Sequence, residues 1–185
     1  PRHAKSAATL LCCACDHIHM GSLSELGPID PQIDGLPALG LKSAIEHIAQ
    51  LVAEHPHATE LFAKYISQTI KPIHLGYYER VAESAVQYAE RLLSPHKSTL
   101  GQTPEKIAHK LVYEYKDHGF AIDKHEAQEI FGPNIVRHNT DEYKLGNDLY
   151  SCLDFIGRIA NIVDHTFYMI GSIAADPTFT KRKKP

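Results

Sequence analysis

A run of nine residues without a charged side chain, from Ala7 to Cys15, follows Ser6 near the start of the chain. The run consists of Ala, Leu and Cys with one Thr, so every face of a helix built from it is small or apolar. A surface helix carries polar residues along one face, whereas a helix that is apolar all round is buried. The run therefore predicts a short buried helix over residues 6–15, with a packed domain around it.

The composition is sufficient for one such domain. The chain has 185 residues, 43% of them hydrophobic, and a net charge of −3, which gives no global attraction to nucleic acid. We expect one domain over residues 1–175 and a basic, flexible tail over 176–185, which contains the run Lys181–Lys184.

Periodicity and turn residues predict an α/β chain that is mostly helical after its first 40 residues. His17–Met20 is expected to be a strand, and residues 22–37, rich in Gly and Pro, a loop. Residues 120–123 are expected to form a further short strand. Helices are predicted over 38–52, 59–70, 75–92, from Pro104 onward, over 124–131 and over 148–174. The last of these carries Asp154, Arg158 and Asp164, so it is expected to pack inside the protein rather than span a membrane.

The cysteines and histidines near the start of the chain suggest a metal site at first sight. They are Cys12, Cys13, Cys15, His17 and His19. Successive helical residues point about 100° apart, so the three cysteines would point in three directions, while the two histidines would share a strand face away from them. We expect the cysteines to pack as reduced, small apolar groups, with no metal or other cofactor bound.

Ser6 stands where a short extended segment meets the predicted helix. A serine in this position commonly caps the helix by accepting a hydrogen bond from a backbone N–H. A nucleophile in the same position would have free N–H groups beside it that can stabilise an oxyanion. The local pattern leaves both interpretations open.

Three blocks of sequence closely resemble the serine dehydrogenase proteinase family. They are Lys5–Leu11 with Ala14–Gly21, then Ser24–Gln32 (SELGPIDPQ), and the later block His118–Asp123 with Glu126 and Ala127. This family is similar to the Clp peptidases and signal peptide peptidases. The resemblance implies a Clp/crotonase-like fold, here its C-terminal half with a helix-rich C-terminal portion, and a serine peptidase that works through an acyl-enzyme.

The resemblance implies Ser6 as the nucleophile and the Ala7 N–H as an oxyanion donor. Signal peptide peptidases use a Ser–Lys dyad, and Lys42 occupies the place of that lysine, on an apolar helical stripe with Ile45, Ala49 and Val52. Asp30 falls near the place of the Clp histidine, although an ordinary carboxylate is a weak base for a hydroxyl at neutral pH. We therefore expect Lys42 to be the base. Asp30, His17 and His19 stay open as alternative bases.

The strands that precede the nucleophile in this fold, and the Gly-rich loop that gives a second oxyanion donor, are not found before Ser6. We expect a truncated or split gene product that alone is inactive or nearly so. Expected partners are a peptide or protein substrate and further copies of the chain, and not nucleic acid. A cytoplasmic location is expected, with membrane association through a preceding part left open. The alternatives are a non-catalytic assembly or interaction module and a Cys/His metal-binding protein.

Overall fold

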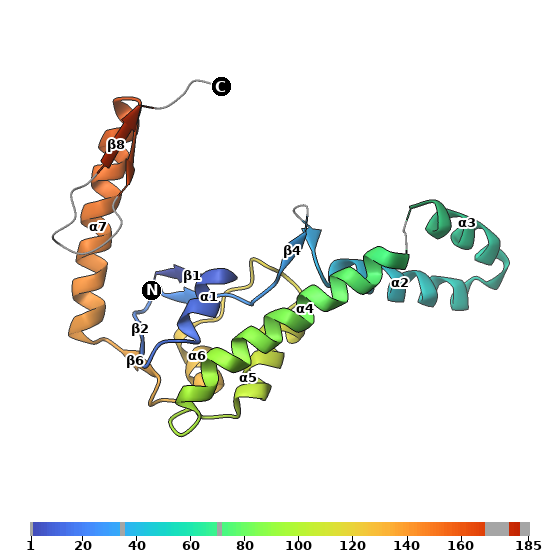
Figure 1. Ribbon diagram of the computed structural model, residues 1–185, viewed down its shortest axis with the longest axis horizontal. Helices are drawn as coiled ribbons and strands as arrows, with labels where there is room; N and C mark the ends of the chain where they lie inside the picture. The colour runs from blue at the N-terminus through green and yellow to red at the C-terminus, as the bar shows by residue number, and fades with distance from the viewer. Residues whose placement is uncertain (1, 34–35, 70–71, 169–177, 182–185) are drawn as a thin grey trace. The chain divides into compact units, whose positions relative to one another are not determined.

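The computed structural model describes residues 2–33, 36–69, 72–168 and 178–181 of the chain (Figure 1). The chain divides into two compact units, residues 1–138 and residues 139–185. The domain predicted over residues 1–175 spans the first unit and part of the second, and its extent stays a prediction. The residues expected as a basic tail include a described strand at 178–181, and the other tail residues lie outside the described ranges.

The described part of the first unit contains three pairs of short strands. β1 (His3–Ala4) pairs in parallel with β3 (Glu25–Leu26), and β2 (Ile18–Met20) pairs in parallel with β6 (Val136–His138). β4 (Gln32–Ile33) and β5 (Leu36–Pro37) form an antiparallel pair. Each sheet among the described residues has two strands. The strand predicted at residues 17–20 is confirmed as β2.

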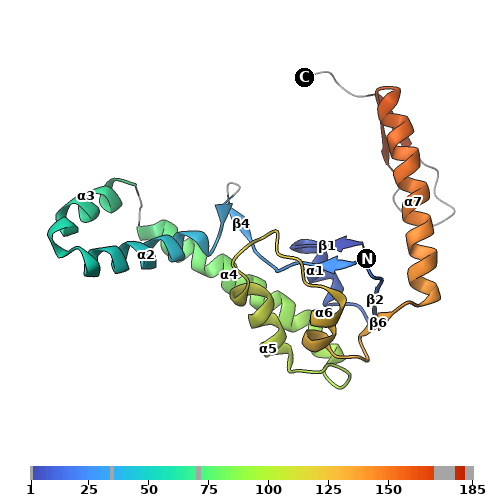
Figure 2. The ribbon, with the colours of Figure 1, turned by 180° about the vertical axis from the view of Figure 1, so that it is seen from behind.

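Helices make up most of the first unit. They are α1 (Ala7–Cys12), α2 (Gly40–Glu54), α3 (Thr59–Thr69), α4 (Pro72–Leu93), α5 (Pro104–His109) and α6 (Lys124–Phe131), with short helical turns at Pro56–Ala58, Ser94–His96 and Lys110–Glu114. Figures 1 and 2 both show α4 beside α5, and these two helices contact each other closely. The chain is therefore mixed α/β as predicted, while a Clp/crotonase-like fold stays a prediction.

The core of the first unit lies between the short strands and helices α4 to α6. Met20, Leu26 and Ile122 from the strand region are fully buried there. They join an apolar cluster to which α5, the turn that follows it and α6 contribute Ile107, Ala108, Leu111, Val112, Ala127, Ile130 and Phe131. This core holds α1 and β3 in place, and both elements lead to the candidate site described below.

Two predicted elements near the start and middle of the chain are only partly correct. The helix expected over residues 6–15 is limited to Ala7–Cys12, and it is not buried all round, because Leu11 is 70% exposed while Thr9 is buried. The strand expected at residues 120–123 is a single antiparallel bridge between Ile122 and Leu26. The bridge still brings the segment after residue 117 against β3.

The second unit contains α7 (Asp141–Ile162), β7 (His165–Tyr168) and β8 (Thr178–Lys181). The helix predicted over residues 148–174 is therefore wrong at both ends. It ends before Asp164, which has a positive φ of 56°. The following Thr and aromatic residues pair with β8, where Phe167 stands opposite Phe179 with ring centroids 5.3 Å apart. Residues 169–174 of the predicted helix lie outside the described residues. Within the described ranges, no helix has the length and apolar character to cross a membrane.

Candidate active site

Ser6 occupies a sharp turn between β1 and α1. Its backbone has φ 54° and ψ −115°, in the left-handed region that side chains other than glycine rarely adopt. Such a conformation costs on the order of 1–3 kcal/mol and persists only where the surrounding structure enforces it. The Ser6 side chain makes no capping hydrogen bond to the helix. The capping role that the sequence left open is therefore absent, although the serine stands at the capping position.

The turn is held by hydrogen bonds from both sides. The Ser6 N–H donates to the Pro28 carbonyl at 3.0 Å. The buried Thr9 hydroxyl lies 2.6 Å from the Ala4 carbonyl and 2.8 Å from the Gly27 carbonyl, which ties α1 to β1 and to the end of β3. These contacts fix the backbone before and after Ser6, and so they can maintain its strained conformation.

Ala7, the predicted oxyanion donor, is the first residue of α1 and is exposed. The first N–H groups of a helix have no acceptor within the helix. The next amide, that of Ala8, donates to the Lys5 carbonyl at 3.0 Å. An oxyanion role for the Ala7 N–H is compatible with this position and stays a prediction.

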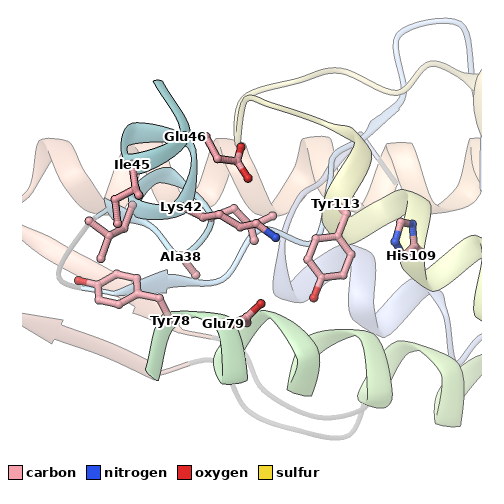
Figure 3. A pocket seen from close by; sticks show the side chains of 10 residues that line it. Ala38, Lys42, Ile45, Glu46, Tyr78, Glu79, His109 and Tyr113 are labelled. Atoms are coloured by element: carbon pink, nitrogen blue, oxygen red, sulfur yellow. The ribbon is translucent and has the colours of Figure 1, made fainter. Parts of the chain in front are cut away.

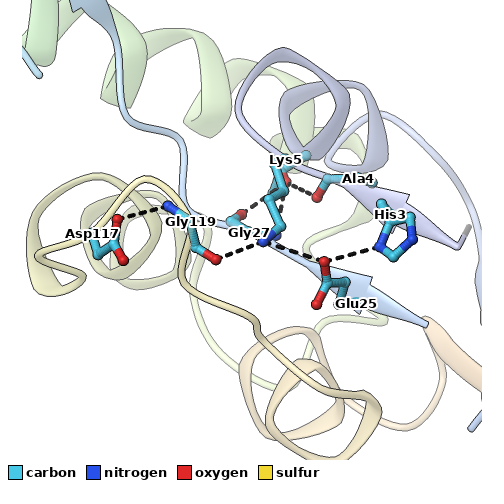
Figure 4. Close-up of polar contacts among 8 residues, drawn as sticks. His3, Ala4, Lys5, Glu25, Gly27, Asp117 and Gly119 are labelled. Atoms are coloured by element: carbon cyan, nitrogen blue, oxygen red, sulfur yellow. Dashed lines mark hydrogen bonds and ion pairs between the residues drawn. The ribbon is translucent and has the colours of Figure 1, made fainter. Parts of the chain in front are cut away.

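Lys5 connects the Ser6 turn to a distant segment of the chain (Figure 4). Its Nζ donates to the Gly119 carbonyl at 2.6 Å and lies 3.2 Å from a Glu25 carboxylate oxygen. The stem of Lys5 crosses Gly27, where an added Cβ would stand 2.6 Å from the Lys5 Cγ. A residue with a side chain at position 27 would therefore displace Lys5. The contact places residues 117–119 beside the residue that precedes Ser6.

Asp30 and His118 form a pair in the same region. The Asp30 carboxylate lies 3.3 Å from the His118 Nδ1, and the residue is only 7% exposed. Gln32 donates a second, longer hydrogen bond of 3.4 Å to the same carboxylate oxygen. Asp30 stands two residues beyond Pro28, which accepts from the Ser6 N–H. Asp30 was predicted as an alternative base, whereas no role was predicted for His118, although it begins the third block of the family resemblance.

Lys42, the predicted base, lies in the first turn of α2 and is exposed. It borders a cavity of about 620 Å³ between α2, α4 and the turn after α5. Figure 3 shows its amine directed toward Tyr113 and Glu79. The residues that line the cavity are Ala38, Leu39, Leu41, Lys42, Ile45, Glu46, Tyr78, Glu79, His109 and Tyr113. Ser6 is not among them, so the structure does not bring Ser6 and Lys42 to one cavity, and the dyad stays a prediction.

His17 and His19, the other predicted alternatives, lie on and beside β2. Their rings contact each other edge to face with centroids 6.1 Å apart. β2 pairs with β6 rather than with the β1–β3 pair next to Ser6.

The cysteines differ in their surroundings. Cys13 is buried in the core at 1% exposure, whereas Cys15 and Cys152 are exposed, and all four thiols of the chain are unpaired. Burial raises the pKa of Cys13 to about 12 and that of Cys12 to about 11. In the parts of the chain that the structure describes, no group of three or more His, Cys, Asp or Glu side chains is placed to hold a metal ion.

Replacing Cys13 with alanine should lower the free energy of unfolding by about 1 kcal/mol, because it opens a small cavity in the core. The matched Cys15→Ala change on the surface should have an effect of less than about 0.5 kcal/mol. The raised thiol pKa stabilises the fold fully below the unfolded value of about 9, and this stability is lost as the pH rises toward 12. Urea unfolding at several pH values checks both effects. Equal losses in the two variants would contradict the buried, packing role of Cys13.

Comparisons with known proteins give no match. No protein-family model, curated protein or solved structure matches this chain. The resemblance to the serine dehydrogenase proteinase family therefore stays a prediction from the three sequence blocks.

Proposed function

We propose that this protein is a serine peptidase-like hydrolase that cleaves peptide bonds through an acyl-enzyme, with Ser6 as its nucleophile. One observation carries the proposal: Ser6 is held at φ 54° and ψ −115° in a strand–turn–helix, and its hydroxyl does not cap the helix. A strained turn from a strand into a helix is the arrangement that exposes the nucleophile in many serine hydrolases. Strained residues of this kind concentrate at functional sites.

The proposed reaction has two stages. The Ser6 Oγ attacks the carbonyl carbon of the peptide bond while its proton passes to a general base, and the base then gives this proton to the departing amine. Water removes the acyl group from Ser6 in the second stage. The Ala7 N–H would face the oxyanion, and the substrate would be a peptide or protein chain. Assembly into a homo-oligomer is part of the proposal and rests on the family resemblance alone.

A fluorophosphonate probe tests the nucleophile. We expect the complete gene product to take up one probe molecule on Ser6, since an activated serine reacts with the phosphorus atom as it would with a carbonyl carbon. Labelling should disappear in Ser6→Ala and persist in Ser94→Ala, where the hydroxyl is exposed and bonded to the Glu90 carbonyl. Mass spectrometry of the intact protein and of its peptides measures both.

Two results would overturn the proposal. One is undiminished labelling in Ser6→Ala, which would move the nucleophile elsewhere. The other is a folded, complete protein that takes up no probe and hydrolyses no peptide, as expected for a non-catalytic assembly module.

A further inference from the structure

The pair of Asp30 and His118 has no role in the predicted Ser–Lys dyad, and it lies next to the Ser6 turn. Two independent contacts connect the pair to that turn. The Ser6 N–H bonds to Pro28, two residues before Asp30, and Lys5 bonds to Gly119, the residue after His118. Two residues 88 positions apart in the sequence are thereby paired, and a neighbour of each contacts Lys5 or Ser6.

We propose that His118 is the general base for Ser6 and that Asp30 positions it, which rests on the proposed function of Ser6. The near-complete burial of Asp30 and its 3.3 Å contact with the His118 Nδ1 define the roles. A carboxylate that accepts a hydrogen bond from Nδ1 fixes the ring and its tautomer, which leaves Nε2 able to accept a proton. Imidazole suits this role near neutral pH better than a carboxylate does.

The proposed proton transfers follow the same order as in a serine–histidine–aspartate triad. The His118 Nε2 accepts the Ser6 hydroxyl proton as the Oγ–carbon bond forms, and the imidazolium gives this proton to the amine nitrogen as the carbon–nitrogen bond breaks. Asp30 stays ionised throughout. Among the described residues, the hydrogen bonds of Ser6 run through its backbone to Pro28 and Leu10, and that of His118 runs to Asp30. Catalytic hydrogen bonds in ligand-free enzymes are often long and shorten only when the substrate is bound.

The charges around His118 come from several elements. Asp30 contacts the ring directly, while Asp117 accepts a hydrogen bond from the Gly119 N–H at 2.9 Å. Lys5 reaches the Gly119 carbonyl from the Ser6 turn, and its amine is paired with Glu25 (Figure 4). The His118 ring thus contacts the Asp30 carboxylate. The positive charge of Lys5 is paired with the Glu25 carboxylate.

The test measures peptide hydrolysis and fluorophosphonate labelling in the complete gene product. His118→Gln should lower kcat/KM by about 10²–10⁴-fold, and Asp30→Asn should produce a loss of similar order. His125→Gln, a change of an exposed histidine in α6, is the matched control and should leave the rate unchanged. The acid limb of the pH profile of kcat/KM should disappear in His118→Gln, a change that a purely structural role would not cause.

The outcomes separate this inference from the proposed function. Stoichiometric labelling of Ser6 in the wild type, with an unchanged rate and pH profile in folded His118→Gln, would overturn the role of His118 and leave Ser6 as the nucleophile. Loss of activity in Lys42→Arg together with full activity in His118→Gln would assign the base to Lys42 instead. Absence of Ser6 labelling in the wild type would overturn the proposed function itself. Restored activity of His118→Ala on addition of free imidazole would support the inference.

Discussion

Ser6→Gly is expected to raise the free energy of unfolding by about 1 kcal/mol while it abolishes hydrolysis and fluorophosphonate labelling. Glycine adopts a φ of 54° without steric cost, so the change releases part of the strain that Ser6 stores. The hydroxyl is lost at the same time, and with it the nucleophile. A stabilising change that removes activity is the result expected of a residue strained for function. Urea unfolding and peptide hydrolysis measure the two effects on the same protein.

Two further variants control this prediction. Ser6→Ala should remove activity with little gain in stability, because alanine is strained in the same backbone conformation. Thr103→Ala changes a residue that does cap a helix, through a hydrogen bond from the Lys106 N–H, and should cost about 1 kcal/mol with no loss of activity. If Ser6→Ala instead behaved like Thr103→Ala, and Ser6→Gly gave no gain in stability and kept its activity, Ser6 would be a helix cap and not a strained nucleophile.

Gly132→Ala should lower the free energy of unfolding by about 3 kcal/mol, the largest effect on stability that we expect from a single methyl group. Gly132 ends α6 with a positive φ of 96°. An added Cβ would also stand 2.6 Å from the Gly101 N and 2.9 Å from its Cα, closer than such atoms approach in proteins. The Gly101 N–H donates to the Phe131 carbonyl at this crossing. The backbone must therefore move, and β6, which follows, would move with it.

Gly76→Ala in α4 is the matched control for this change. An added Cβ at Gly76 meets no atom within 4 Å. A glycine-to-alanine change inside a helix usually stabilises it, by up to about 1 kcal/mol. Urea unfolding of both variants should thus give shifts of opposite sign. Equal and small effects would mean that the contact between Gly101 and Gly132 is not a close one in solution.

Local signals fixed some helix ends in the prediction, but the start of α7 was missed although Thr140 caps it through the Tyr143 N–H. The helix Lys124–Phe131 was predicted with its observed bounds because Gly132 and Pro133 mark its end, and Thr103 with Pro104 marked the start of α5; the cap that Asp123 provides was not predicted. The end of α7 was missed because it depends on the pairing of β7 with β8, a contact between separate segments. Local periodicity carries no information on such pairings.

The candidate site was predictable only in part for the same reason. Ser6 was identified from its place before a helix and from the family resemblance, but its backbone strain has no signal in the sequence, since serine is not a residue typical of positive φ. His118 was missed because its meeting with Asp30 depends on the contacts of two distant segments. Lys42 was selected from its place in the resemblance and from its apolar stripe, and the structure shows it at a cavity that Ser6 does not line.

The most direct test of Ser6 as the nucleophile is the mass of the complete protein after an acid quench during turnover of p-nitrophenyl acetate. Cleavage after Glu25 and Glu46 separates the peptide that contains Ser6 from the peptide that contains Lys42. We expect one acetyl group per chain, on the peptide that ends at Glu25, and its loss in Ser6→Ala. Steady turnover with an unacetylated Ser6 peptide, at a rate that Ser6→Ala leaves unchanged, would contradict this expectation.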